Sequence, residues 1–276
     1  MKNISFIFIL LFCSFLIGSA YSEDIDGANI VNTDDDEPKI FTEDGTSLTI
    51  TNSATLSKSN GSKAVGIDNR DNGTLIIHSG STVTTLAANG SNAVSATGQS
   101  GLTLTNSGTI SAGNSKAIGL QNAENSTVTN NAGGIIKSNT NTITFTQKGS
   151  STANIVTINN SGEIYAEADS SGTTSNNAIR SESATDNITI INNSGGHIHN
   201  NNSANTVIKS ATVYISSAST GTLTNSGKIE NKAGVNNYAL GIAESGVTVT
   251  LKDKGKVIVL VLLLIIPPAL FVTVEF

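Results

Sequence analysis

The sequence predicts an all-β solenoid of parallel strands with about eight coils, and three observations support this prediction. A short motif ending in Asn-Ser-Gly returns about every 29 residues along the chain. Apolar residues alternate with threonine just before it, as in LTLTNSGTI at 102–110. The composition, with 26 glycines, no tryptophan and only 4% aromatic residues, is unsuited to a compact core of large side chains.

The first motif sets the repeat length. Near copies of LTLTNSGTI are TINNSGEI at 157–164, IINNSGGHI at 190–198 and LTNSGKI at 223–229. The residue after the Asn-Ser pair, or after its degenerate equivalent, marks eight register points: Ala54, Gly80, Gly108, Gly133, Gly162, Gly195, Gly227 and Gly255. Their spacings vary from 25 to 33 residues, which indicates one structural unit with loops of variable length.

A second motif falls inside most units, so that one unit holds two or three short strands. Its copies are KAVGIDN (63–69), NAVSATG (92–98), KAIGLQN (116–122), NAIRSES (177–183), NTVIKSA (205–211) and NYALGIA (237–243). In the first motif Leu102 and Leu104 share one face of a strand, and Thr103 and Thr105 share the other. We expect the leucines to point inward and the threonines outward.

Strands this short bury an apolar face only by stacking on the next unit, with amides bonded from coil to coil. At the usual strand spacing of ~4.8 Å, about eight coils give a stack of the order of 40 Å. Asparagine tolerates the left-handed backbone of a sharp turn, and stacked amides can bond to one another. We therefore predict a structural asparagine ladder at one corner, formed by Asn52, Asn106, Asn131, Asn160, Asn193 and Asn225, with His78 and Asp253 as substitutes.

Outward threonine pairs recur along the chain and predict a flat hydroxyl face. The pairs are Thr49/Thr51, Thr103/Thr105, Thr127/Thr129, Thr222/Thr224 and Thr248/Thr250. Flat Thr-x-Thr arrays resemble those of ice-binding solenoids, and ice binding is one alternative function. Threonine is also a common residue of exposed strands, so the face is equally compatible with another role.

The first 22 residues are typical of a secretory signal peptide. Lys2 precedes the apolar run ISFIFILLFCSFLI, and small residues come before the acidic EDID. Cys13, the only cysteine, lies in this run, so we expect an exported chain without disulfides. Residues 23–44 form an acidic N-terminal segment or cap. A net charge of −6 with only Arg70 and Arg180 as arginines disfavours nucleic acid as a partner.

The unit TNSGTI … KAIGL, repeated behind a signal peptide over about residues 45 to 255, resembles the passenger domain of bacterial autotransporters (type V secretion). The resemblance implies a right-handed parallel β-helix that crosses the outer membrane and is displayed at the cell surface or secreted. It also implies an adhesin-like interaction scaffold whose partner is a host or matrix surface molecule, either protein or glycan. Residues 45–256 are the expected β-solenoid repeats.

The family pattern adds a C-terminal translocator barrel, for which this chain has no room, and residues 257–276 form an apolar tail instead. We consider three interpretations of the tail. It is an out-of-frame end of a truncated passenger, a membrane-associated segment or lipid-anchor signal interrupted by Pro267 and Pro268, or a last coil with a capping strand. The first predicts a tail that packs poorly.

Two clusters are candidate metal sites. His197 and His199 lie two residues apart, so both point the same way on a strand and offer two nitrogens for zinc or copper. No third ligand is evident in the nearby sequence, and we expect two exposed surface histidines. The run Asp34, Asp35, Asp36, Glu37 lacks the spaced ligands of a calcium loop, and we expect a solvated segment. We therefore predict no metal and no cofactor.

A third alternative is an enzyme that acts on polysaccharides, as some parallel β-helices do. Asp68, Arg70 and Asp71 form the one tight mixed-charge cluster with an arginine before the tail, and charged turn residues explain it without catalysis. We therefore predict no catalytic residues. The expected binding surfaces are the outward threonine face and the longer loops at 165–176 and 199–204.

The strand register generates a prediction of stability. Replacement of inward Leu104 or Ile158 by Asp places an unpaired carboxylate in the solenoid interior and should unfold the neighbouring coils. Thermal unfolding followed by circular dichroism measures the effect. An unfolding transition like that of the unsubstituted protein would contradict the register.

Overall fold

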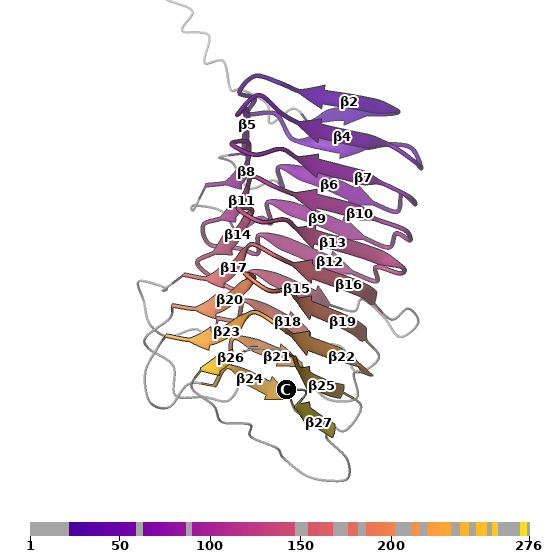
Figure 1. Ribbon diagram of the computed structural model, residues 1–276. Coiled ribbons are helices and arrows are strands. Elements are labelled where there is room, and N and C mark those ends of the chain that lie inside the picture. Colours follow the sequence, from indigo (N-terminus) through magenta and orange to yellow (C-terminus); the bar gives the residue numbers. More distant parts are fainter. Residues whose placement is uncertain are drawn as a thin grey trace, which may run out of the picture.

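The computed structural model describes residues 22–58, 63–86, 90–146, 154–167, 176–181, 186–201, 211–215, 220–232, 238–242, 247–252, 256–258 and 271–274. All regular elements in these segments are β-strands, arranged in three parallel sheets (Figure 1). The predicted signal peptide lies outside the described residues, apart from Ser22.

Each sheet contains every third strand of the chain, except near the two ends. We name the sheets A, B and C. Sheet A consists of β1 (Glu23–Ile25), β3 (Lys39–Phe41), β6 (Val65–Asp68), β9 (Val94–Thr97), β12 (Ile118–Gln121), β15 (Ile143–Thr146), β18 (Ile179–Ser181), β21 (Val213–Ile215) and β24 (Leu240–Ile242). Sheet B consists of β2 (Ala28–Val31), β4 (Ser47–Ile50), β7 (Thr74–Ile77), β10 (Thr103–Asn106), β13 (Ser126–Asn130), β16 (Ile155–Asn160), β19 (Asn187–Asn192), β22 (Thr220–Asn225), β25 (Val247–Leu251) and β27 (Phe271–Val274). Sheet C consists of β5 (Thr55–Lys58), β8 (Thr82–Thr85), β11 (Thr109–Ala112), β14 (Ile135–Ser138), β17 (Glu163–Ala166), β20 (His197–Asn200), β23 (Lys228–Asn231) and β26 (Lys256–Ile258).

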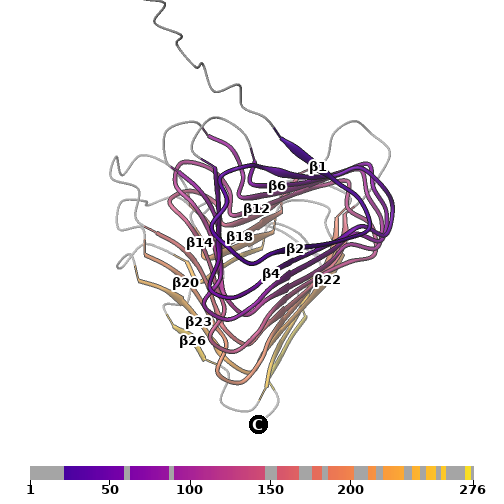
Figure 2. The ribbon, with the colours of Figure 1, turned by 90° about the horizontal axis from the view of Figure 1, so that it is seen from above.

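The chain forms a right-handed parallel β-helix, which confirms the predicted fold class. From β4 to β24, each coil adds a strand to sheet B, then to sheet C and then to sheet A, and neighbouring coils pair in parallel, as β10 does with β7 and β13. Along the stack axis the three sheets surround a common interior (Figure 2). Among the described residues the sheets hold nine, ten and eight strands, close to the predicted eight coils.

The interior is filled by aliphatic side chains from alternate strand positions. Leu48, Leu75, Leu104, Val128 and Ile158 follow one another in register on sheet B and are fully buried. The prediction that leucines point inward is therefore confirmed. Each such side chain contributes ~1.5–3 kcal/mol when it is fully buried, so a coil with a few of them is stable only within the stack.

The ends of the helix extend beyond the predicted repeat region. Residues 23–44, predicted as an acidic segment or cap, contain β1, β2 and β3 and form the first coil. Buried Lys39 pairs there with Glu23 and with Asp35, whose carboxylate lies 2.6 Å from the Lys39 ammonium. In the tail, β26 extends sheet C and β27 pairs with β25 of sheet B. Residues 259–270 and 275–276 lie outside the described residues, and the three interpretations of the tail stay predictions.

The second motif corresponds to the strands of sheet A, with two differences from the prediction. Residues 141–147, NTITFTQ, supply β15 although the motif search did not include them. The motif copy at 205–211 lies outside the described residues apart from Ala211, and the described strand of sheet A in this coil is β21 at Val213–Ile215, which pairs with β18. In the other copies an alanine directly precedes the strand of sheet A. Thr142 and Thr212 occupy this position in the two exceptions, so neither segment matches the motif.

A buried ladder of five asparagines runs along the corner between sheets B and C. Each Nδ2 group donates to the Oδ1 atom of the next asparagine, from Asn106 to Asn130 to Asn160 to Asn192 to Asn225, at 2.8, 2.9, 2.8 and 2.7 Å. The second Nδ2 hydrogen of the first four binds a glycine carbonyl at the corner. All five side chains are buried, and their amides are satisfied from coil to coil.

The ladder explains why Asn-Ser-Gly recurs. In the short corners, such as Asn160-Ser161-Gly162, the chain turns within two residues, and a Cβ atom at Gly162 would lie 2.2 Å from the carbonyl oxygen of Gly134. Glycine is required there by close approach to the preceding coil. Longer corners insert two residues and place a glycine at positive φ, as at Gly133 and Gly195.

The predicted ladder differs from the observed one. Asn106, Asn160 and Asn225 belong to it, whereas in two long corners the ladder residue is one position earlier than predicted. Asn131 and Asn193 instead donate to Ser107 and Ser161 on the outer side. Asn52 is exposed at φ 56°, and the ladder position of its coil is taken by Ile50.

The left-handed backbone predicted for the ladder also occurs at a different corner. Successive coils place Gly45, Asn72, Gly101 and Asn125 at positive φ between sheets A and B. The ladder asparagines Asn106 and Asn160 are strand residues, and their role depends on the amide and not on the backbone conformation. Asp253 lies outside the described residues, and His78 is an exposed corner residue.

The ladder predicts a large difference between two adjacent asparagines. Asn160→Ala leaves the Asn130 amide hydrogen and the Asn192 carbonyl oxygen unpaired in the interior and should lower the free energy of unfolding by about 2–4 kcal/mol. Asn193→Ala is the matched control, because it removes only a half-buried bond to Ser161 and should cost about 1 kcal/mol or less. Urea titration measures both, and equal losses would contradict the assignment of the ladder.

Candidate functional site

The outer surface of sheet B carries an unbroken column of seven threonines, which we call the threonine column. The parallel register aligns Thr74, Thr103, Thr127, Thr157, Thr189, Thr222 and Thr248 on seven successive strands. Each lies on the face opposite the buried residues and is exposed or half-buried. Parallel pairing therefore converts a scattered sequence pattern into a row of hydroxyl groups with the ~4.8 Å spacing of strands.

A second, interrupted column lies beside the first. It contains Thr49, Thr105, Thr129, Thr224 and Thr250, with Ile76, Asn159 and Ile191 between them. Eight of the ten predicted threonines thus form pairs on β10, β13, β22 and β25. The pair Thr49/Thr51 is shifted by two residues, because Thr49 aligns with the second column through Ile76 and Thr51 lies past the end of β4.

Three members of the threonine column are not among the threonines predicted from the sequence. Thr74, Thr157 and Thr189 have no threonine two residues later, so they did not match the Thr-x-Thr pattern. Each of them lies three residues before the ladder position of its coil. These ladder positions are Ile77, Asn160 and Asn192. This separation of three residues identifies a column threonine only when the ladder position of the coil is known.

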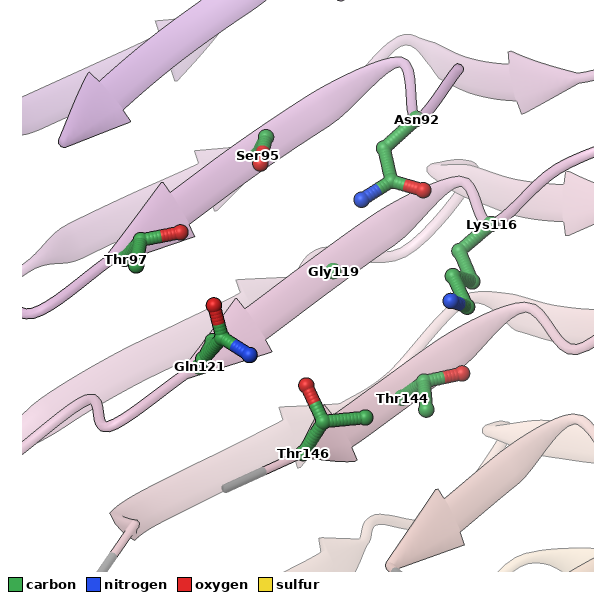
Figure 3. A pocket seen from close by; sticks show the side chains of 8 residues that line it. All are labelled: Asn92, Ser95, Thr97, Lys116, Gly119, Gln121, Thr144 and Thr146. Atoms are coloured by element: carbon green, nitrogen blue, oxygen red, sulfur yellow. The ribbon is translucent and has the colours of Figure 1, made fainter. Parts of the chain in front are cut away.

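A polar hollow lies on the outer face of sheet A (Figure 3). Its lining comes from the outward positions of β9, β12 and β15 and from the residues before them: Asn92, Ser95, Thr97, Lys116, Gly119, Gln121, Thr144 and Thr146. Gly119 lacks a side chain and leaves space between Ser95 and Thr144, and the Asn92 amide lies over it. The volume is about 200 Å³. Small-molecule pockets are larger, at ~300–1,000 Å³, and mostly apolar, so this hollow is better suited to surface contact.

Five aromatic, imidazole and acidic side chains lie together on the outer face of sheet C. We call them the histidine cluster: Glu163, Tyr165, His197, His199 and Glu230. The register pairs Glu163 with His197, and Tyr165 with His199, on adjacent strands β17 and β20. The Tyr165 and His199 rings stack with centroids 4.6 Å apart, and the two histidine rings lie 4.2 Å apart. His197 Nε2 lies 3.2 Å from the Glu230 carboxylate on β23.

The prediction that both histidines are exposed is wrong. His199 is only 4% exposed, because its ring is covered by the rings of Tyr165 and His197, and His197 is half-buried. Burial, with smaller contributions from the neighbouring His197 and Lys232, lowers the pKa of His199 to about 4. Burial, Lys228 and Lys232 also lower the pKa of His197, although Glu230 opposes this shift. Both imidazoles are therefore neutral at pH 7.

The other predicted clusters take structural positions. In the acidic run, Asp34 accepts a hydrogen bond from the Thr55 amide of β5, which joins the first coil to the next one. Asp35 pairs with Lys39 within the first coil. Asp36 and Glu37 are exposed.

The mixed-charge cluster lies at the corner that follows β6. Asp68 pairs with Lys63, and the Asp71 carboxylate accepts a hydrogen bond from the Ser100 amide at 2.7 Å. Asp71 therefore fixes the corner of the next coil. The Arg70 Nε atom and the Asp68 Oδ1 atom are buried without a hydrogen-bond partner.

Of the two predicted binding loops, residues 168–175 and 202–204 lie outside the described residues. Within the described segments, no helix has the length and apolar character needed to cross a membrane. Comparison of the chain with protein-family models, with curated proteins and with solved structures finds no match.

Proposed function

We propose that this protein is an exported interaction scaffold, an adhesin-like β-helix that binds a host or matrix surface molecule through the threonine column. The threonine column itself is the observation that supports the proposal. It presents seven equivalent hydroxyl groups on a backbone that is hydrogen-bonded on both sides, so binding requires little further ordering of the scaffold.

The composition of this surface favours a polar partner. Hydroxyl groups both donate and accept hydrogen bonds, as do the hydroxyls of glycans and the edges of peptide strands. Three large apolar residues are exposed in the described segments: Ile30, Leu86 and Ile155. Ile30 and Ile155 lie on the outer face of sheet B, on the distant strands β2 and β16, and Leu86 follows β8 of sheet C, so the three form no continuous apolar patch with one another. A repeated row of weak contacts gains affinity when a partner engages several coils at once.

The proposed location is the cell surface or the medium outside the outer membrane. The signal-like first 22 residues, the repeat pattern similar to autotransporter passengers and the β-helix architecture support it. In this proposal a translocator barrel delivers the passenger across the outer membrane, and residues 23–252 with β26 and β27 are the displayed part.

The threonine column predicts a face-specific loss of binding. The double substitution Thr127→Lys with Thr157→Lys places two bulky charges on adjacent strands of sheet B and should weaken binding to the target at least tenfold, equivalent to about 1.4 kcal/mol. The assay is binding of the purified chain to a panel of immobilised matrix proteins and glycans and to cultured cells.

The matched control is Thr82→Lys with Thr109→Lys, two outward threonines that are paired in the same way on sheet C. It should leave both binding and the unfolding temperature unchanged. Equal effects of the two double variants, or no binding to any member of the panel, would contradict the proposed scaffold surface.

Ice binding is a second candidate, favoured by one specific observation. On β10 with β13, and on β22 with β25, two threonines of one strand lie in register with two threonines of the next. This is the local arrangement of a flat Thr-x-Thr array. Asn159 and Ile191 separate the two blocks, and Ile76 precedes the first one.

Inhibition of ice recrystallisation distinguishes the two functions. If the array binds ice, the protein should slow crystal growth at micromolar concentration, and Thr103→Lys with Thr127→Lys should abolish the effect because charges prevent close contact with the lattice. Crystal growth equal to that in buffer would exclude ice binding and leave the interaction scaffold.

A further inference from the structure

The histidine cluster brings carboxylate and imidazole groups together on the outer face of sheet C. In the four strands of sheet C before the cluster, the outward positions carry neither group. At the two outward positions of this sheet, β5, β8 and β11 carry only serine and threonine, and β14 carries Ile135 and Lys137. From β17 onward these positions become Glu163 and Tyr165, then His197 and His199. We propose that Glu163, His197 and His199 bind a zinc ion on the outer face of sheet C.

The three side chains already lie within reach of one ion. One carboxylate oxygen of Glu163 and one ring nitrogen of each histidine lie within 4.8 Å of one another. Ligand atoms of tetrahedral zinc, with bonds of about 2.0–2.1 Å, are about 3.4 Å apart. Glu163 is exposed at the start of β17, so a change of its side-chain rotamer can close the difference without moving the backbone.

Each histidine has a partner that orients one of its nitrogens. His199 Nδ1 lies 3.0 Å from the Asn201 side-chain oxygen, which can only accept, so Nδ1 carries the hydrogen and Nε2 keeps its lone pair. His197 Nε2 lies 3.2 Å from Glu230, which in the same way directs the hydrogen to Nε2 and leaves the lone pair on Nδ1. Carboxylate and amide partners of this kind orient the histidine ligands of metal sites.

The surrounding charges allow a cation to bind. Lys228 is paired with Glu230 at 2.7 Å and Lys137 with Glu167 at 3.0 Å, so both ammonium groups are balanced by carboxylates. Lys232 is exposed to solvent. Glu163 supplies one negative charge to the ion.

Two nitrogens and one carboxylate oxygen form a donor set that suits zinc better than calcium or magnesium, which prefer oxygen ligands. Three protein ligands leave a fourth coordination position open, as in zinc sites with an exchangeable water or an external ligand. Because Glu163 and the histidines belong to adjacent coils, the ion would also connect β17 to β20 (Figure 1).

The test is a titration of the purified full-length chain with Zn²⁺ by calorimetry, with unfolding temperature as a second measurement. The protein should bind one equivalent of Zn²⁺, and saturation should raise the unfolding temperature by a few degrees because only the folded state holds the ligands together. Glu163→Gln, an exposed and nearly isosteric change, and His197→Gln should each lower affinity at least tenfold. Glu230→Gln should also weaken binding, by about tenfold or more, through the orientation of His197.

The matched control is His78→Gln, which removes the one histidine of the chain outside the cluster, an exposed residue at a corner beside sheet B. It should bind Zn²⁺ as the unsubstituted protein does, and excess Mg²⁺ should not compete. Each variant should unfold at the unsubstituted temperature without metal, which excludes misfolding as the cause. The proposal is overturned by absence of saturable binding, by unchanged affinity in both Glu163→Gln and His197→Gln, or by an equal loss in His78→Gln. Such results would show that the cluster is an aromatic stack only.

Discussion

Parallel hydrogen bonding between successive coils is the interaction on which the rest of the structure depends. A single coil has three strands of three to six residues and cannot satisfy its amides or bury its aliphatic side chains alone. Pairing with the coils before and after it does both. It also places equivalent residues above one another, so each side chain meets its counterpart in the next coil. Columns of like residues are therefore the basic unit of this protein, inside and outside.

The corners absorb the irregularity of the sequence and protect the register of the strands. Consecutive ladder asparagines are separated by 24, 30, 32 and 33 residues, yet the strands that carry them pair residue for residue. The extra residues lie in long corners and in segments between sheets, where added length costs little free energy. Within the strands a shift of one residue would turn Asn160 outward and expose Ile158, so the register is strongly specified.

The three faces use the same backbone for different purposes. Sheet B repeats one residue type over seven coils, which suits extended contact with a repetitive or polar partner. Sheet C changes its outward residues from Thr109 to Glu163 and His197 within three coils, which suits a local site. The proposed scaffold surface and the proposed zinc site are thus on different sheets, and a substitution in one does not alter the contacts of the other.

The sequence by itself determined the repeat, the alternation that points Leu104 inward and Thr103 outward, and the parallel solenoid, because these depend on local periodicity and on a spacing that recurs along the chain. It also indicated a stack of asparagines, but it placed two of them one residue late, because the long corners that contain Gly133 and Gly195 hold two more residues than the short corners. Only the tertiary structure decided that Thr157 joins the column of Thr127, or that Glu163 and Glu230 approach His197. These residues are about 30 positions apart in the chain, and only coil-to-coil pairing determines which of them become neighbours.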